Sequence, residues 1–148
     1  MNNHLRTFDD YELFLYTLTD CYPLSITRST LVLVRIGATL ARVTGDVWFT
    51  HGFRLSVRER LSGDRLPLVI VSYGYEVWGG PDKLYWYDSQ PHPDDPALQS
   101  TQPHHKHVPP DMKHHRIPSP EMSFNEANLP FLLEEIEQLL QTSNLYLQ

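Results

Sequence analysis

The sequence of 148 residues contains a single cysteine, Cys21, and no long hydrophobic run. One cysteine excludes an intramolecular disulfide and a cysteine-rich zinc site. The longest apolar run covers only residues 31–34, which is far too short to span a membrane. Residues 1–4 lack the basic and apolar regions of a signal peptide. We therefore expect a cytoplasmic protein that has no membrane as its partner.

Several sequence motifs of common enzyme classes are also missing. The sequence has no glycine-rich phosphate loop, no Gly-x-Ser-x-Gly turn and no His-Glu-x-x-His pair. Kinases, serine hydrolases and zinc peptidases of the usual types therefore have no support. No internal repeat is visible, and the length is typical of one domain, so we expect a single domain over residues 1–148.

Basic residues are missing from the C-terminal part of the chain. Residues 121–148 hold five acidic residues and no Lys or Arg, whereas residues 28–65 hold seven Arg against three acidic residues. The formal net charge of −6 therefore hides a basic middle region. Such a region indicates either a face that meets phosphate groups or the solvated arginine face of an antiparallel sheet.

The hydrophobic periodicity predicts an α+β fold. Apolar spacing and end signals predict helices over residues 8–21 and 129–141. Between them, five strands are expected from alternating or β-branched runs, over residues 30–36, 40–50, 53–61, 66–78 and 83–88. Short turns join these strands, so the sheet should be antiparallel and twisted, with both helices on one face.

The third expected strand has the clearest alternation. Arg54, Arg58 and Arg60 fall on one face, and the other face is apolar except for Glu59. Three guanidinium groups along one face are candidates for binding the phosphates of RNA.

The region 91–120 has a different composition from the rest. It contains eight prolines and six of the eight histidines, and it shows no apolar period. We expect a long functional loop here, because structureless stretches of this length inside a domain are uncommon otherwise. Its densest part, residues 103–116, holds five His, two Lys and one Arg.

Histidine can accept and donate a proton near neutral pH. Cleavage of RNA by its own 2′-hydroxyl needs a base, an acid and a cation beside the phosphate, and this segment could supply them without a metal or other cofactor. The candidate catalytic residues are His104, His105, His107, His114 and His115. The candidate phosphate-binding residues in the same segment are Lys106, Lys113 and Arg116.

Three other interpretations of the histidines stay open. His104, His107 and His114 could reach one metal ion, although the tight spacing of a zinc motif is absent. The segment could also hold phosphates without cleaving them. Finally, the imidazoles could bind backbone carbonyls of a loop that has few other partners.

An aromatic cluster precedes this segment. Tyr85 and its aromatic neighbours Trp78, Trp86 and Tyr87 could stack on RNA bases, or they could belong to the core. Asp88, which ends the fifth strand, could orient a histidine or cap the following turn.

Several of these runs resemble the TumE-like toxin family of prokaryotic type II toxin–antitoxin systems. The resemblance spans roughly residues 25–140, and its most specific part is the block His104-His105-Lys106-His107 that follows an aromatic strand. The matching runs are residues 75–78, 83–88, 91–93, 103–111, 113–118 and 128–132.

The resemblance implies a small cytoplasmic toxin whose partner is a cognate antitoxin with a helix-turn-helix domain. It also suggests RNA or translation as the target. Small toxins of the RelE and ParE type share the broad α+β plan, although a fold does not fix a function. We predict a metal-independent endoribonuclease that uses histidine acid–base catalysis. The alternative is a non-catalytic module that binds nucleic acid or protein with the His/Lys/Arg segment as a phosphate clamp.

Overall fold

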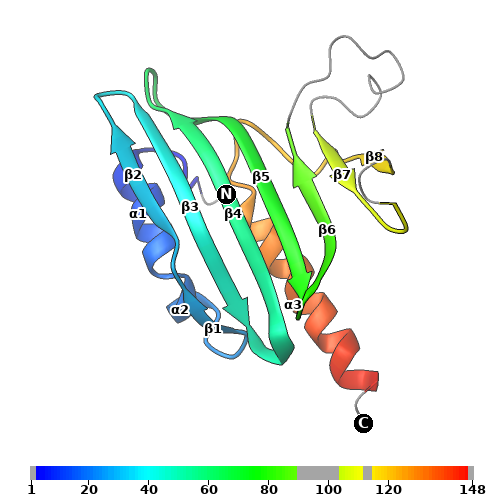
Figure 1. The fold of residues 1–148 in the computed structure, drawn as a ribbon. Coiled ribbons are helices and arrows are strands. Elements are labelled where there is room, and N and C mark those ends of the chain that lie inside the picture. Colours follow the sequence, from blue (N-terminus) through cyan, green and yellow to red (C-terminus); the bar gives the residue numbers. More distant parts are fainter. Residues whose placement is uncertain (1–2, 90–103, 112–114, 147–148) are drawn as a thin grey trace.

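A computed structural model describes residues 3–89, 104–111 and 115–146 as one sheet with helices at both ends of the chain (Figure 1). The helices are α1 (Phe8–Tyr16), α2 (Leu18–Cys21) and α3 (Leu129–Tyr146), and a 3-10 turn covers Thr50–Gly52. The strands are β1 (Ile26–Ser29), β2 (Val32–Ile36), β3 (Leu40–Phe49), β4 (Phe53–Ser62), β5 (Val69–Gly79), β6 (Asp82–Asp88), β7 (His105–His107) and β8 (Arg116–Pro118).

The α+β class and the antiparallel pairing are confirmed, but the expected number of five strands is wrong. The described residues form eight strands in the order β1-β3-β4-β5-β6-β7-β8, and β2 pairs with β3 beside β1. All seven pairs are antiparallel.

Part of the difference arises before the first expected strand: β2 lies within the expected range 30–36, and β1 is an additional strand that precedes it. The chain between them bends towards Gly45 of β3, where an added Cβ would lie 2.5 Å from the Thr30 carbonyl oxygen. The amide of Thr30 donates a 2.9 Å hydrogen bond to the Asp46 carbonyl at this point. Gly45 has a φ of 139°, which other residues rarely adopt, so the bend depends on this glycine.

The rest of the difference lies in the region 91–120, where a long loop was expected. This loop is not confirmed, because residues 105–107 and 116–118 form β7 and β8 and extend the sheet beyond β6. Residues 90–103 and 112–114 lie outside the described residues. Short strands of three residues show too little alternation to be recognised from sequence.

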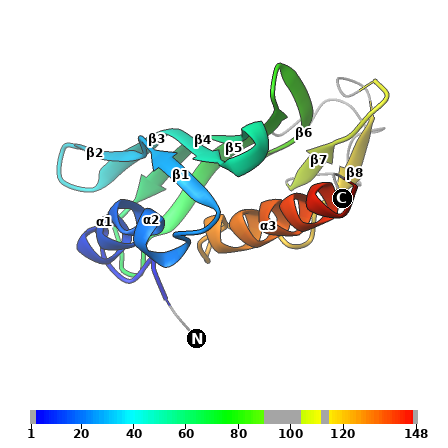
Figure 2. The same cartoon turned by 90° about the horizontal axis from the view of Figure 1, so that it is seen from below.

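The three helices cover one face of the sheet (Figure 2). The expected N-terminal helix is interrupted at Thr17, whose amide bonds back to Leu13 and Phe14. The expected C-terminal helix begins at Leu129 as predicted and continues to Tyr146. Its residues Leu129, Leu132, Leu133 and Ile136 are fully buried in the core. Among the described residues, no helix combines the length and the apolar composition needed to cross a membrane.

The sheet therefore has an inner face, which packs on the helices, and an outer face, which points away from them. On β4 the inner residues Leu55, Val57 and Leu61 are buried, whereas Arg58 and Arg60 are exposed on the outer face. The predicted alternation of β4 is thus confirmed. All residues that share the outer face can contribute to one surface, whichever strand carries them.

Candidate functional site

One row of outer-face residues crosses the sheet and links the arginines to the histidines. The registers of the successive strand pairs align Thr44 of β3, Arg58 of β4, Gly74 of β5, Asp88 of β6 and His105 of β7. Directly aligned side chains on one face of an antiparallel pair lie about 4.5–5.5 Å apart at Cβ. The sheet therefore brings residues 44 and 105 onto one face.

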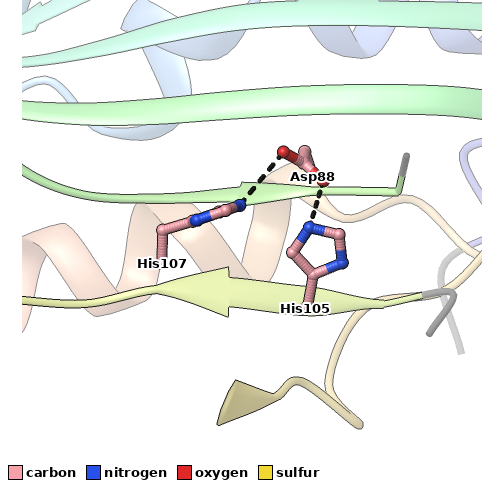
Figure 3. A group of neighbouring side chains, drawn as sticks. All are labelled: Asp88, His105 and His107. Carbon is pink, nitrogen blue, oxygen red and sulfur yellow. Dashed lines mark hydrogen bonds and ion pairs between the residues drawn. The ribbon is translucent and has the colours of Figure 1, made fainter. Parts of the chain in front are cut away.

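Asp88 forms the centre of a cluster with two histidines (Figure 3). Its carboxylate Oδ1 contacts Nε2 of His105, and its Oδ2 lies 3.2 Å from Nε2 of His107. The two imidazoles come from alternate positions of β7, so both point to the same face and reach the last residue of β6. One carboxylate thus orients two imidazole rings through their Nε2 atoms.

The two histidines are enclosed, and the carboxylate reaches the surface. His105 is 0% exposed and His107 is 5% exposed, whereas the Asp88 side chain is 20% exposed. The ring of His107 stacks on Trp86 at 4.0 Å between centroids, and it forms an edge-to-face pair with the His105 ring at 4.9 Å between centroids. This packing fixes the orientation of the His107 ring, so the cluster is preorganised.

A groove on the outer face joins this cluster to three arginines. The residues that line its cavity of about 420 Å³ include Arg42, Thr44, Arg58, Glu59, Arg60, Ser72 and Asp88, and Asp88 is the cluster residue among them. Within the described part of the chain, no carboxylate forms an ion pair with Arg42, Arg58 or Arg60. Unpaired guanidinium groups in a groove favour an anionic ligand such as a phosphate.

Gly74 allows one of these arginines to approach the cluster. A Cβ at Gly74 would lie 2.5 Å from Nη2 and 3.1 Å from Cζ of Arg58, so the guanidinium lies directly over the glycine. Gly74 is the cross-strand partner of Asp88. The missing side chain at residue 74 therefore leaves room for a cation between β4 and the Asp88 carboxylate.

Arg54 differs from the other predicted arginines. It lies on the same outer face but forms a 3.3 Å ion pair with Asp46, and its guanidinium lies 5.0 Å from the ring centroid of Trp78. It does not line the groove.

Three of the predicted site residues lie on the inner face. Nδ1 of His104 shares a 2.6 Å hydrogen bond with the hydroxyl of Tyr73, and burial lowers the pKa of this histidine. Nζ of Lys106 lies 3.7 Å from the Glu135 carboxylate of α3 and 4.2 Å from the Tyr85 ring centroid. The Tyr85 hydroxyl donates a 2.6 Å hydrogen bond to Glu135. The structure therefore places these three side chains away from the groove.

The remaining predicted residues lie around β8. Arg116 is the cross-strand partner of His107 on the outer face, beside the cluster. His115 is exposed, and its Nδ1 lies 3.0 Å from the Asp111 carbonyl in the preceding turn. Lys113 and His114 lie outside the described residues.

The cluster could also hold a metal ion. Asp88, His105 and His107 each offer one ligand atom, and these atoms lie within 4.8 Å of one another. Two imidazoles and one carboxylate suit zinc and similar transition metals. This set differs from the combination of His104, His107 and His114 considered from the sequence, because His104 lies on the opposite face of the sheet.

Sequence reasoning missed Arg42 as part of the groove. Its position opposite Arg60 depends on the pairing register of β3 and β4. The alternation of β3 places Arg42 and Thr44 on one face, which is a signal that could have identified them.

Comparison with known protein families agrees with the resemblance of the sequence. A family model described as Toxin TumE matches residues 16–140, which is most of the chain. The chain belongs to the TumE toxin family. Membership implies a toxin function and an antitoxin as its partner in general. Comparisons with curated proteins and with solved structures give no match. The outer-face groove and its Asp88 cluster are therefore the candidate site of a TumE-family toxin.

Proposed function

We propose that this TumE-family chain is a metal-independent endoribonuclease whose site is the outer-face groove. The observation that carries the proposal is the alignment of unpaired Arg58 with the Asp88–His105–His107 cluster across Gly74. This arrangement combines groups that exchange protons with cations that bind a phosphate, on one surface and within a few strands.

The chemistry is an attack of the ribose 2′-hydroxyl on the adjacent phosphorus. The 2′-oxygen loses its proton to a base and bonds to phosphorus, and the bond to the 5′-oxygen breaks as that oxygen gains a proton from an acid. The products are a 2′,3′-cyclic phosphate and a 5′-hydroxyl. Arg42, Arg58 and Arg60 stabilise the negative charge that develops on the phosphorane oxygens.

The burial of the cluster suggests how the roles are divided. Asp88 lines the groove, where it contacts the substrate. His105 contacts one oxygen of the Asp88 carboxylate from the buried side. The pair Asp88–His105 acts as the base, and protonated His107 acts as the acid. Because Asp88 is the cluster residue that lines the groove, His107 gives its proton to the leaving oxygen at the point where its Nε2 meets the Asp88 carboxylate.

The test is cleavage of a single-stranded RNA by the purified chain in the presence of EDTA. We expect products with 2′,3′-cyclic phosphate ends, and we expect His107→Ala to lower the rate by about 10²-fold or more. His104→Gln is the matched control, because His104 belongs to the same block but lies on the inner face. It should cleave at nearly the wild-type rate.

Other outcomes would overturn parts of this proposal. If cleavage is lost in EDTA and returns with Zn²⁺ or Mn²⁺, the cluster is a metal centre and the metal-independent mechanism is wrong. If His107→Ala cleaves like the wild type, the acid assignment is wrong. If wild-type protein arrests growth but cleaves no RNA, the endoribonuclease proposal fails.

The second candidate function is a phosphate clamp that does not cleave. The three unpaired arginines of the groove favour it, because they bind phosphate whether or not a proton is transferred. Replacing His105 and His107 together by Arg separates the two functions. A clamp should retain RNA binding and growth arrest, whereas an endoribonuclease should lose growth arrest.

The position of Arg58 over Gly74 leads to a further prediction. Gly74→Ala should push the guanidinium aside, because the new Cβ would meet its Nη2 and Cζ atoms. We expect RNA cleavage to fall by about 10–100-fold, since misplacing a group by about 1 Å can cost that much. The displaced atoms are the end of a flexible side chain, so the melting temperature should change little. Unchanged cleavage would show that Arg58 does not act from this position.

A further inference from the structure

The outer face carries a group of exposed apolar side chains at the end of the sheet where β2 lies. We call this group the apolar edge; it consists of Val32, Val34, Ile36, Leu40, Val69 and Val71. Each of these side chains is between 39% and 54% exposed. Scattered exposed apolar residues are ordinary, but a contiguous group on one sheet face is typical of an interaction surface.

Strand registers place the residues of β2 beside Leu40 of β3, and Val69 and Val71 of β5 lie beyond β4 along the same face. Ile36 pairs with Leu40, which is aligned through Ser62 with Val69, and Val34 pairs with Arg42 in the next row. β2 carries Val32, Val34 and Ile36 on its outer face. Within the described part of the chain, β2 pairs only with β3, so β2 lies at an edge of the sheet. The apolar edge is therefore accessible from the outer face and from the side.

The apolar edge continues directly into the groove. Arg42 and Arg60 are aligned neighbours in the row that begins at Val34, and both arginines line the groove. Val71 belongs to the apolar edge and also lines the groove. A partner that covers the apolar edge would therefore reach the arginines as well.

We infer that the antitoxin of this TumE-family chain docks on the apolar edge and covers the adjoining arginine groove. Its docking segment would present apolar side chains to Val32, Val34 and Ile36, and carboxylates to Arg42 and Arg60. An acidic segment fits because no carboxylate of the described residues pairs with either guanidinium. Charge complementarity of this kind fixes the partner and the register of docking.

Charge also argues against a second copy of the chain that docks with this same outer face. The groove arginines would have to meet an acidic surface of the other copy. On this outer face, Asp46 and Glu76 are already paired with Arg54 and Lys83 at 3.3 Å and 2.5 Å. An antitoxin can supply its own carboxylates.

If the proposed function is correct, docking explains how the antitoxin inhibits RNA cleavage, since the covered groove is the proposed RNA site. Docking itself does not require RNA cleavage. Binding of the antitoxin and cleavage of RNA are therefore measured separately, so that one can fail without the other.

The experiment changes the apolar edge without changing the groove. In the triple variant Val32→Thr, Val34→Thr and Ile36→Thr, each residue stays β-branched, so the strand preference of β2 is retained. The probe is the purified protein encoded by the gene adjoining this one, titrated by calorimetry in the absence of RNA. We expect its Kd to rise by about tenfold or more. In cells, the variant should still arrest growth but should escape rescue by that protein.

The matched control is Ile117→Thr on β8, at the opposite end of the sheet. Ile117 is 46% exposed, as is Ile36, so the control loses about as much exposed apolar surface as one of the three substitutions. The control should bind with the wild-type Kd. Thermal melting of each variant distinguishes loss of docking from loss of the fold.

Two results would overturn the inference. One is a folded triple variant that binds the antitoxin with wild-type affinity. If Ile117→Thr then weakens binding, the docking site is the β7–β8 end of the sheet. The other is a dimer of the chain alone, seen by light scattering, that becomes a monomer in the triple variant. In that case the apolar edge is an interface between two copies.

Discussion

Replacing Asp88 with asparagine should lower the rate of RNA cleavage by about two to four orders of magnitude. The Asp88 carboxylate uses one oxygen for His105 and the other for His107. Asparagine has nearly the same shape but offers one oxygen and one amide nitrogen, so one of the imidazoles would face a donor instead of an acceptor. The variant also removes the negative charge that the proposed base requires. The measurement is the single-turnover rate on a short RNA.

Asp46→Asn provides the matched control for this prediction. Asp46 is an outer-face carboxylate that contacts Arg54, outside the groove. The Asp46→Asn variant should cleave RNA at close to the wild-type rate. Binding of a 2′-deoxy analogue, which cannot be cleaved, should be similar in wild type and Asp88→Asn because the groove arginines remain. Equal cleavage rates for Asp88→Asn and the wild type would refute a proton-transfer role for the cluster.

The sequence was sufficient to predict elements that have a long and regular pattern. The helical face of residues 129–141 and the alternation of Arg54 to Leu61 depend only on neighbours along the chain, and both appear in the structure. The aromatic run 83–88 also forms a strand as expected. Local periodicity fixes such elements because the burial of one face stabilises them wherever the partner lies.

The candidate site could be predicted only in part, because its geometry depends on strand pairing. No pairing register could be predicted for residues 104–107, which were expected in a loop. As a strand, this block alternates, so His105 and His107 face Asp88, whereas His104 and Lys106 face Tyr73 and Glu135. A difference of one residue thus decides whether a histidine reaches Asp88.

The alternation of β4 also left one residue without a role, Glu59 on the apolar face. The structure shows this carboxylate 1% exposed, with a 2.5 Å hydrogen bond from the Tyr11 hydroxyl and another from the Tyr75 hydroxyl. Asn128 donates a 3.1 Å bond to the same Tyr75 hydroxyl. The network joins α1, the sheet and the start of α3, so Glu59 is a structural residue of the core.

Replacing Glu59 with alanine should lower the free energy of unfolding by about 2–4 kcal/mol. The substitution leaves two buried tyrosine hydroxyls without their acceptor, and each buried unsatisfied group costs about 1–3 kcal/mol, partly offset because the buried charge is removed. The measurement is urea unfolding at neutral pH. Glu76→Ala serves as the control, because Glu76 forms a partly exposed ion pair with Lys83. It should change stability by about 1 kcal/mol or less.

The variant Glu59→Gln should reveal whether the wild-type carboxyl group is ionised in the folded state. Burial raises the pKa of Glu59 above its ordinary value of about 4.5, and the two tyrosine hydrogen bonds only partly oppose this. The folded state therefore holds the proton more tightly than the unfolded state. Wild-type stability should fall, relative to Glu59→Gln, as the pH rises from about 4.5 through the raised pKa, because the folded state must then ionise a buried acid.

The difference in unfolding free energy between the two proteins, measured from pH 4 to 8, should show this slope. A difference that does not vary with pH would mean that Glu59 titrates equally in the folded and unfolded states, contrary to its burial among the core tyrosines.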